Sequence, residues 1–114
     1  MSTITAPLKD GLKIGEVVHT EAEIREATAA DLVEATEESE KVVATGEGYQ
    51  LLASPTMVAL HTLRRQVVRV GEYKGPLTLA ELKKLSAHDL SLLQERAMAL
   101  ESASLVQVTD RGRD

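Results

Sequence analysis

The first 26 residues alternate apolar and polar positions, which is the period of a β-strand with one buried face. The apolar residues from Ile4 to Leu8 share one face of such a strand, and the alternation resumes after Asp10-Gly11. Asp-Gly between two alternating stretches indicates a hairpin turn, since glycine adopts a positive φ angle at little cost. The pattern therefore predicts a β-hairpin arm over residues 1–26.

Beyond residue 27 the apolar positions recur every three or four residues, which is the period of a helix with one buried face. Thr28 followed by Asp31 has the form of a helix cap with an acid at the third helical position. Ser54-Pro55 is a second start signal, because proline fits the first turn of a helix. Caps and apolar stripes of this kind predict helices over residues 29–44, 54–70, 79–84 and 87–104.

These elements predict a single domain of the α+β class that is mostly helical. An N-terminal β-hairpin is followed by three or four helices packed around an aliphatic core. The chain has no Phe and no Trp, so Leu, Val, Ile, Met and Ala must fill that core, and such side chains suit helix-on-helix packing. The expected segments are a hairpin arm at 1–26, an acidic helix at 28–45, a helical core at 54–104 and a flexible tail at 105–114.

Composition excludes several classes of protein. The net charge is −5, and residues 1–48 carry 4 Lys/Arg and 11 Asp/Glu, against 9 and 7 in residues 49–114. With so few clustered cations we expect no nucleic-acid partner. The chain has no cysteine, which excludes disulfides and thiolate metal sites. No secretory signal and no apolar run of about 20 residues is present, so we expect no membrane partner and a cytoplasmic site of action.

No arrangement of residues at chemically useful spacing predicts an enzyme. The three histidines, at positions 19, 61 and 88, have no metal-ligand partner at helical spacing. The sequence His88-Asp89 is interpreted as the first turn of a capped helix, and His61 as a solvated or partner-facing residue. Neither a phosphate-binding glycine loop nor a serine nucleophile motif occurs. We therefore predict no catalytic, cofactor-binding or metal-binding residue.

Two lines of residues on the predicted helices are candidates for contact with a partner. Arg65 and Arg69 continue a basic line from His61, with Arg64 beside them. These arginines either pair with the acidic helix of the same chain, contact an acidic partner surface or enter a DNA groove. Leu92, Ala99 and Ala103 form a small apolar line, which the N-terminal hairpin either covers or leaves exposed for a partner helix.

Several blocks of caps, turns and apolar positions follow one another along the chain: Leu8 with Asp10-Gly11, then Ile24–Leu32, Leu63–Gly71, Gly75–Thr78, Leu82, Leu85-Ser86 and Asp89-Leu90. Their order resembles that of a known family, the tail assembly chaperones of Mu-like bacteriophages (the Mu gp41-like kind). The similarity extends over about residues 8 to 100. In the block Ile24–Leu32, family members often carry proline where this chain has Ala27.

The resemblance implies a non-enzymatic chaperone that binds the tape measure protein, the tail tube protein or both during tail morphogenesis. Such a protein acts in the cytoplasm of the infected bacterial host and is not expected in the mature virion. We predict that Arg64, Arg65 and Arg69 supply charge selectivity and that Leu92, Ala99 and Ala103 supply apolar contact. Self-association is left open. The competing interpretations are a small phage-encoded DNA-associated regulator and a minor structural tail protein.

Overall fold

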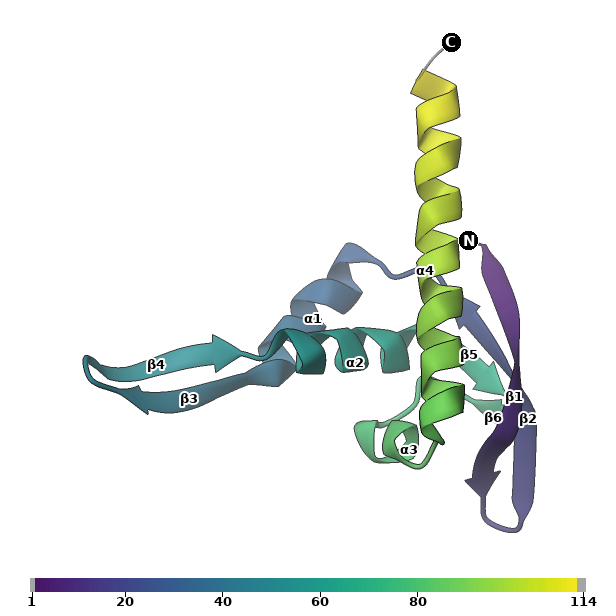
Figure 1. Cartoon of the computed structure of the whole chain (residues 1–114), viewed down its shortest axis with the longest axis horizontal. Helices are drawn as coiled ribbons and strands as arrows, with labels where there is room; N and C mark the ends of the chain where they lie inside the picture. The colour runs from purple at the N-terminus through teal and green to yellow at the C-terminus, as the bar shows by residue number, and fades with distance from the viewer. Residues whose placement is uncertain (1, 113–114) are drawn as a thin grey trace.

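The computed structural model describes the backbone of residues 2–112 and the side chains of residues 2–103. A four-stranded antiparallel sheet lies against a long C-terminal helix, and two further helices lead from it to a second, two-stranded sheet that projects to one side (Figure 1). The elements are β1 (Thr3–Ile14), β2 (Val17–Arg25), α1 (Ala29–Ser39), β3 (Glu40–Thr45), β4 (Gly48–Ala53), α2 (Pro55–Gln66), β5 (Val67–Val70), β6 (Tyr73–Lys74), α3 (Leu79–Lys83) and α4 (Ala87–Gly112).

The main sheet has the strand order β1-β2-β5-β6 and begins with an N-terminal hairpin. Its turn lies at Gly15-Glu16, where Ile14 pairs with Val17. The predicted turn at Asp10-Gly11 is wrong. Those two residues lie in an irregular part of β1, between Pro7 and Leu12, where the register with β2 shifts. Gly11 has a φ of +81° there, so the Asp-Gly signal marks a β-bulge and not the hairpin turn.

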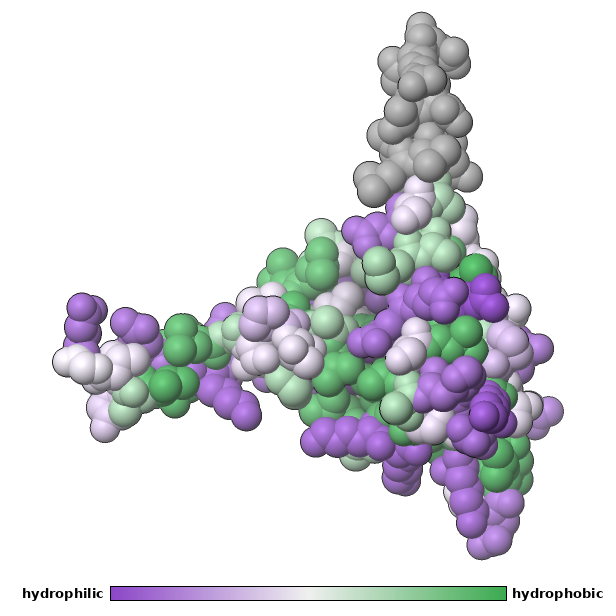
Figure 2. Space-filling view, viewed as in Figure 1, coloured by the Kyte–Doolittle hydropathy of each residue, from purple (hydrophilic) through white to green (hydrophobic). Residues whose placement is uncertain are grey.

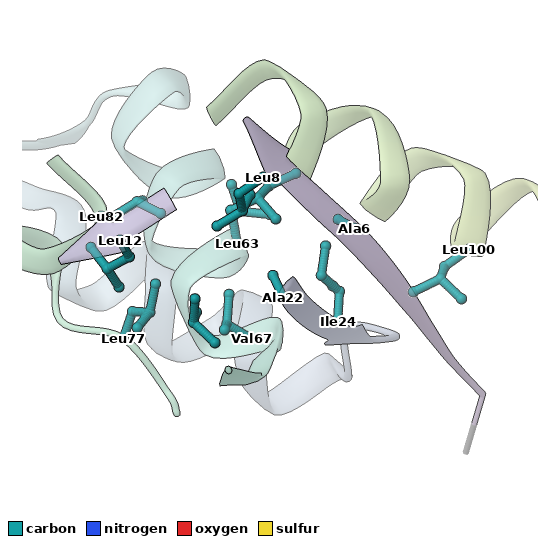
Figure 3. Close-up of a cluster of buried hydrophobic side chains, with 12 residues drawn as sticks. Ala6, Leu8, Leu12, Ala22, Ile24, Leu63, Val67, Leu77, Leu82 and Leu100 are labelled. Carbon is teal, nitrogen blue, oxygen red and sulfur yellow. The ribbon is translucent and has the colours of Figure 1, made fainter. Parts of the chain in front are cut away.

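The core lies between the main sheet, α2 and α4 and is wholly aliphatic among its buried members (Figure 3). Leu93 and Leu100 of α4 pack toward the sheet, and Leu63 of α2 closes the cluster from the other side. The apolar spacing in the helix predicted at 54–70 indicates a buried stripe of Met57, Leu60, Leu63, Val67 and Val70. The last three are buried, whereas Met57 and Leu60 are only half-buried. The buried members are Ala6, Leu8, Leu12, Ala22, Ile24, Leu63, Val67, Val70, Leu77, Leu82, Leu93 and Leu100.

The prediction of a mostly helical fold is wrong. The structure is 44% helix and 38% strand, because two predicted helices end early and continue as strands. The helix expected over 29–44 ends at Ser39, and the one expected over 54–70 ends at Gln66. The β-branched residues that follow each of them pair with other strands. The sequence Gly46-Glu47-Gly48 predicts a flexible break after the first helix, but Gly46-Glu47 is the turn of a second hairpin and Gly48 begins β4.

The four predicted helix starts are all present. Thr28, Ser54 and Thr78 each accept a backbone N–H with the side-chain hydroxyl, and Ser86 does the same for the N–H of Asp89. The end of α4 differs from the prediction, because its backbone is helical to Gly112 and not only to about residue 104. The flexibility predicted for residues 105–114 concerns a segment whose side chains lie outside the described residues, and it stays a prediction.

Candidate partner-binding surface

The β3–β4 hairpin, residues 40–53, projects from the body of the molecule; we call it the protruding hairpin (Figure 1). Cross-strand neighbours share a face, and the register pairs Val42 with Leu51 and Ala44 with Tyr49. This face is therefore apolar from Val42 and Leu51 outward, and its side chains are open to solvent, with 69% of Val42, 60% of Leu51 and 82% of Tyr49 exposed. At the base of the hairpin the same face carries the pair Glu40 and Ala53. The opposite face is mixed, since it pairs Lys41 with Leu52 and Val43 with Gln50.

The apolar face of the protruding hairpin has no cover within the described part of the chain. The hairpin meets the body mainly at its base, where β4 contacts α1. A two-stranded sheet is at best marginally stable in water, and contiguous exposed apolar side chains are typical of interaction sites. The radius of gyration of 16.4 Å, against about 13 Å for a compact chain of this length, reflects the projecting elements. This face is therefore a candidate docking surface.

A groove of about 800 Å³ lies next to the base of the hairpin, between the start of α1, the outer side of α2 and the middle of α4. Its lining is mainly apolar and includes Leu32, Val58 and Met98, of which Met98 is 68% exposed. Ala53 also lines it, and Ala53 lies on the apolar face of the hairpin, two positions from Leu51. The groove and the hairpin face thus meet at Ala53. Figure 2 shows apolar side chains both along the hairpin and on the adjoining body.

The groove has an acidic rim. Glu26 and Glu101 line it, and its other polar side chains, Thr62, Gln66 and Gln94, carry no charge. Within the described residues no lysine or arginine lines the groove. A cationic or neutral partner therefore fits this surface better than an anionic one.

The basic line predicted on the helix at 54–70 is largely engaged inside the chain. Arg64 pairs with Glu38 of α1, and Arg65 pairs with both Glu34 and Glu38. Arg69 lies on β5 and not on a helix, and it pairs with Glu21 at 2.9 Å and Glu23 at 3.0 Å on β2. Of the three alternatives for these arginines, the pairing with the acidic helix holds for Arg64 and Arg65.

The prediction that His61 faces solvent or a partner is wrong, because it is 92% buried between α2 and α1. Its Nδ1 accepts a hydrogen bond from Arg64 Nε at 2.9 Å and lies 3.2 Å from Glu38 Oε2. Burial and the neighbouring Arg64 charge lower the pKa of His61, so the imidazole is neutral and can accept that bond. Glu38 pairs with both Arg64 and Arg65 and so joins α1 to α2 beside this imidazole.

Replacing Glu38 with Gln is expected to lower the free energy of unfolding by about 1 kcal/mol, because Arg64 and Arg65 lose a shared charged acceptor while the groups stay partly solvated. The loss should shrink at high salt, which screens the wild-type pairs. Urea unfolding at low and at 1 M salt measures both. Glu37→Gln, one residue away on the exposed side of α1, is the matched control. A loss independent of salt would contradict an ionic origin.

The apolar line predicted on the last helix is divided by the fold. Leu92 is half-buried and packs against the core, whereas Ala99 and Ala103 are exposed. Neither alternative for this line holds for all three residues, and their role in partner contact stays a prediction. The exposed apolar α4 residue in the lining of the groove is the neighbouring Met98. The sequence offered one signal for it, since Met98 is a large apolar residue whose neighbours one helical turn away are polar (Gln94, Glu95, Glu101 and Ser102).

Two buried carboxylates that position these elements were not predicted as such. Asp89 was interpreted only as part of a capped first turn, yet its carboxylate accepts the backbone N–H groups of Lys9, Asp10 and Gly11 at 2.7–3.0 Å. Burial alone would raise the pKa of Asp89, but these backbone hydrogen bonds lower it below its usual value. Asp89 thereby fixes α4 to the bulge of β1.

The second carboxylate, Asp31, joins α1 to the sheet. It caps its own helix through Thr28 and accepts two hydrogen bonds from the Arg25 guanidinium, at 2.7 and 3.0 Å. Arg25 also donates to the carbonyl oxygen of Arg65 at 2.9 Å, at the end of α2. Because of this guanidinium, the pKa of Asp31 is lowered to about 2. The pair sets the positions of α1 and α2, and so of the groove between them.

Comparison with known proteins gives the same assignment over nearly the whole chain. The family model described as tail assembly protein gp41 matches residues 8–113. The chain belongs to this Mu gp41 family. It is 39% identical over 107 residues to the Mu-like prophage FluMu protein gp41 of Haemophilus influenzae, covering 93% of this chain and 84% of that protein. It is 43% identical over 113 residues to the probable tail assembly protein gp41 of Escherichia phage Mu, covering 93% and 77%.

A longer relative in phage Mu extends beyond the region shared with this gp41 family member. The probable tail assembly protein FS-gp41 is 43% identical over 107 residues, which cover 88% of this chain but only 57% of that protein. No solved structure matches the chain. The resemblance inferred from the order of caps, turns and apolar positions is therefore confirmed by the sequence comparisons.

The described residues of this gp41 family member contain no group of three or more His, Asp or Glu side chains placed to hold a metal ion. Among its described helices none is long and apolar enough to cross a membrane. What the molecule offers is an open apolar surface beside an acidic rim, which suits the binding of another macromolecule.

Proposed function

We propose that this chain is a non-enzymatic chaperone of phage tail assembly that binds the tape measure protein, the tail tube subunits or both while the tail is being built. The observation that carries the proposal is its membership of the gp41 family, with 43% identity to the probable tail assembly protein of phage Mu. Family membership supports a role in tail assembly within the infected host. The identity of the partners and the absence of the chain from the mature virion are parts of the proposal.

The uncovered apolar face of the protruding hairpin supports a chaperoning mechanism. As the resemblance implies, a tape measure protein is a long, largely helical chain whose apolar stripes would associate wrongly if left exposed. A small protein with a standing apolar surface can cover such a stripe reversibly, since the surface is formed before the partner arrives. The intrachain pairs of Arg64, Arg65 and Arg69 support the surface by holding α1 to α2 and β5 to β2. A direct contact of these arginines with the partner stays a prediction.

Co-expression with the tape measure protein of the same phage tests the proposal. We expect the soluble fraction of the tape measure protein to rise when the wild-type chain is present and the two proteins to copurify. An unchanged soluble fraction, with no copurification of either tape measure or tube protein, would overturn the chaperone function.

Two further measurements separate the competing classes. Mass spectrometry of purified virions is expected to detect tube protein but not this chain, and stoichiometric detection would favour a structural tail protein. A gel-shift series at low and moderate salt is expected to show no binding to duplex DNA. Steeply salt-dependent binding would favour a DNA-associated regulator.

A further inference from the structure

We propose that the apolar face of the protruding hairpin and the adjoining groove act as one docking site for an amphipathic α-helix whose apolar stripe is flanked by Lys or Arg. The inference deepens the proposed function, on which it rests for the statement that the helix belongs to a tail protein. The site runs from Tyr49 and Leu51 on the hairpin, across Ala53, to Leu32 and Met98 in the groove.

The chemistry of the groove favours a helix over an extended peptide. An extended segment would bury its backbone N–H and C=O groups against apolar side chains, and each group without a partner is costly. The groove offers only the side chains of Thr62, Gln66 and Gln94 as neutral hydrogen-bonding groups. A helix satisfies its own backbone bonds, and it packs both between two helices and on the face of a sheet.

The length of the surface also suits a helix. The hairpin strands have 6 residues each, which corresponds to roughly 20 Å at the usual rise of a strand. The groove extends this surface to α4. A helix of about 20 residues is about 30 Å long, so five or six turns can lie along the hairpin face and into the groove.

A second copy of this chain fits the surface less well. The four apolar side chains of the hairpin face, Val42, Ala44, Tyr49 and Leu51, expose on the order of 400–500 Å². A stable interface buries about 800 Å² on each partner, so two stacked hairpins fall short. The hairpin also carries Glu40 and Glu47 against a single cation, Lys41, and would meet the acidic rim of a neighbouring groove with charge of the same sign.

The flanking cations on the partner follow from the rim. Glu101 is exposed on α4 and lines the groove, and Glu40 shares the hairpin face with its cross-strand neighbour Ala53 at the edge of the groove. Within the described residues no lysine or arginine lines the groove. A helix with Lys or Arg beside its apolar stripe places opposite charge near these two carboxylates, whereas one with Glu places like charge there.

Binding of a synthetic peptide tests the docking site. The probe is a peptide of about 21 residues with Leu at heptad a and d positions and Lys at the flanking positions, labelled for fluorescence anisotropy. A second peptide replaces every flanking Lys with Glu. The full chain is expected to bind the Lys peptide at least about tenfold more tightly than the Glu peptide at low salt. Equal binding of both peptides would overturn the flanking-charge part of the proposal.

Two matched pairs of variants test the location. Leu51→Asp lies on the apolar face, and Leu52→Asp lies on the opposite face of the same strand with a similar exposure, 48% against 60%. Met98→Glu lies in the groove, and Ser91→Glu lies at an exposed position of α4 that does not line it. Leu51→Asp and Met98→Glu are each expected to weaken Lys-peptide binding about tenfold or more. The two controls should change it by less than about threefold.

The outcomes also separate this inference from the proposed function. If the tape measure protein is solubilised by all four variants as well as by the wild type, the docking site is wrong and the chaperone function stands. If the Lys peptide binds with the expected variant pattern but no tail protein is solubilised, the docking site stands and the function is wrong. Equal weakening by Leu51→Asp and Leu52→Asp indicates a strand added to the hairpin edge, and that result overturns the helix. Circular dichroism confirms that each variant is folded.

Discussion

Replacing Asp89 with Ala is expected to lower the free energy of unfolding by about 3–5 kcal/mol, a large part of the stability of a domain this size. The carboxylate is fully buried and accepts backbone N–H groups from Lys9, Asp10 and Gly11. Removing it leaves three donors of the β1 bulge without a partner, in a place that α4 shields from water. Denaturant unfolding followed by circular dichroism measures the loss.

Asp10→Ala is the matched control, since that side chain is exposed and its backbone N–H is retained. It should change stability by less than about 0.5 kcal/mol. The stability loss of Asp89→Asn should lie between those of Asp89→Ala and Asp10→Ala. Its amide oxygen can still accept a hydrogen bond, whereas its amide nitrogen must face the remaining backbone donors. A loss below about 1 kcal/mol for Asp89→Ala would contradict the role of this carboxylate in holding α4 to the sheet.

The pH dependence of stability gives a second signature of the same contact. The folded-state pKa of Asp89 lies below its usual value, so its contribution to stability is fully present above the unfolded-state pKa near 4 and is lost as the pH falls through the folded value. The stability difference between the wild type and Asp89→Asn should therefore be constant near neutral pH and shrink below about pH 4. A difference that grew as the pH fell would have the wrong sign.

Replacing Arg25 with Ala is expected to cost about 2–3 kcal/mol. The change leaves Asp31, whose side chain is only 7% exposed, without its guanidinium partner, and it removes the hydrogen bond to the Arg65 carbonyl oxygen. Denaturant unfolding measures the cost, and Lys13→Ala, an exposed cation on β1, is the control. Adding Asp31→Asn to Arg25→Ala should cost less than the sum of the two single changes, because an uncharged side chain no longer lacks a counter-ion. Strict additivity would contradict the coupling.

The start signals of the helices could be predicted from the sequence because they are local. A cap such as Thr28 or Ser54 bonds to a backbone group three residues away, so both partners of the bond are visible in a short stretch of sequence. The ends of those helices could not be predicted in the same way. The apolar spacing of residues 67–70 continues the helical pattern of α2. These residues form a strand instead, because β2, more than forty residues away in the sequence, offers an open edge with which they pair.

The candidate docking site was missed for a related reason. Val42 and Val43, like Leu51 and Leu52, are adjacent in sequence, and a helical interpretation gives them no common face. Only the pairing of β3 with β4 assigns Val42 and Leu51 to one face and Val43 and Leu52 to the other. Arg64 and Arg65 contact acids of α1 in the same chain, which was one of the three alternatives that the sequence left open for them.

The sequence by itself determined the aliphatic make-up of the core, the four helix starts, the N-terminal hairpin and the family to which the chain belongs, because each depends on residue type or on contacts within a few residues. The tertiary structure alone decided where helices give way to strands, which carboxylates are buried and which apolar residues are left without cover. Those properties depend on contacts with a strand or helix far away in the sequence, and a local sequence pattern does not show which distant segments come into contact.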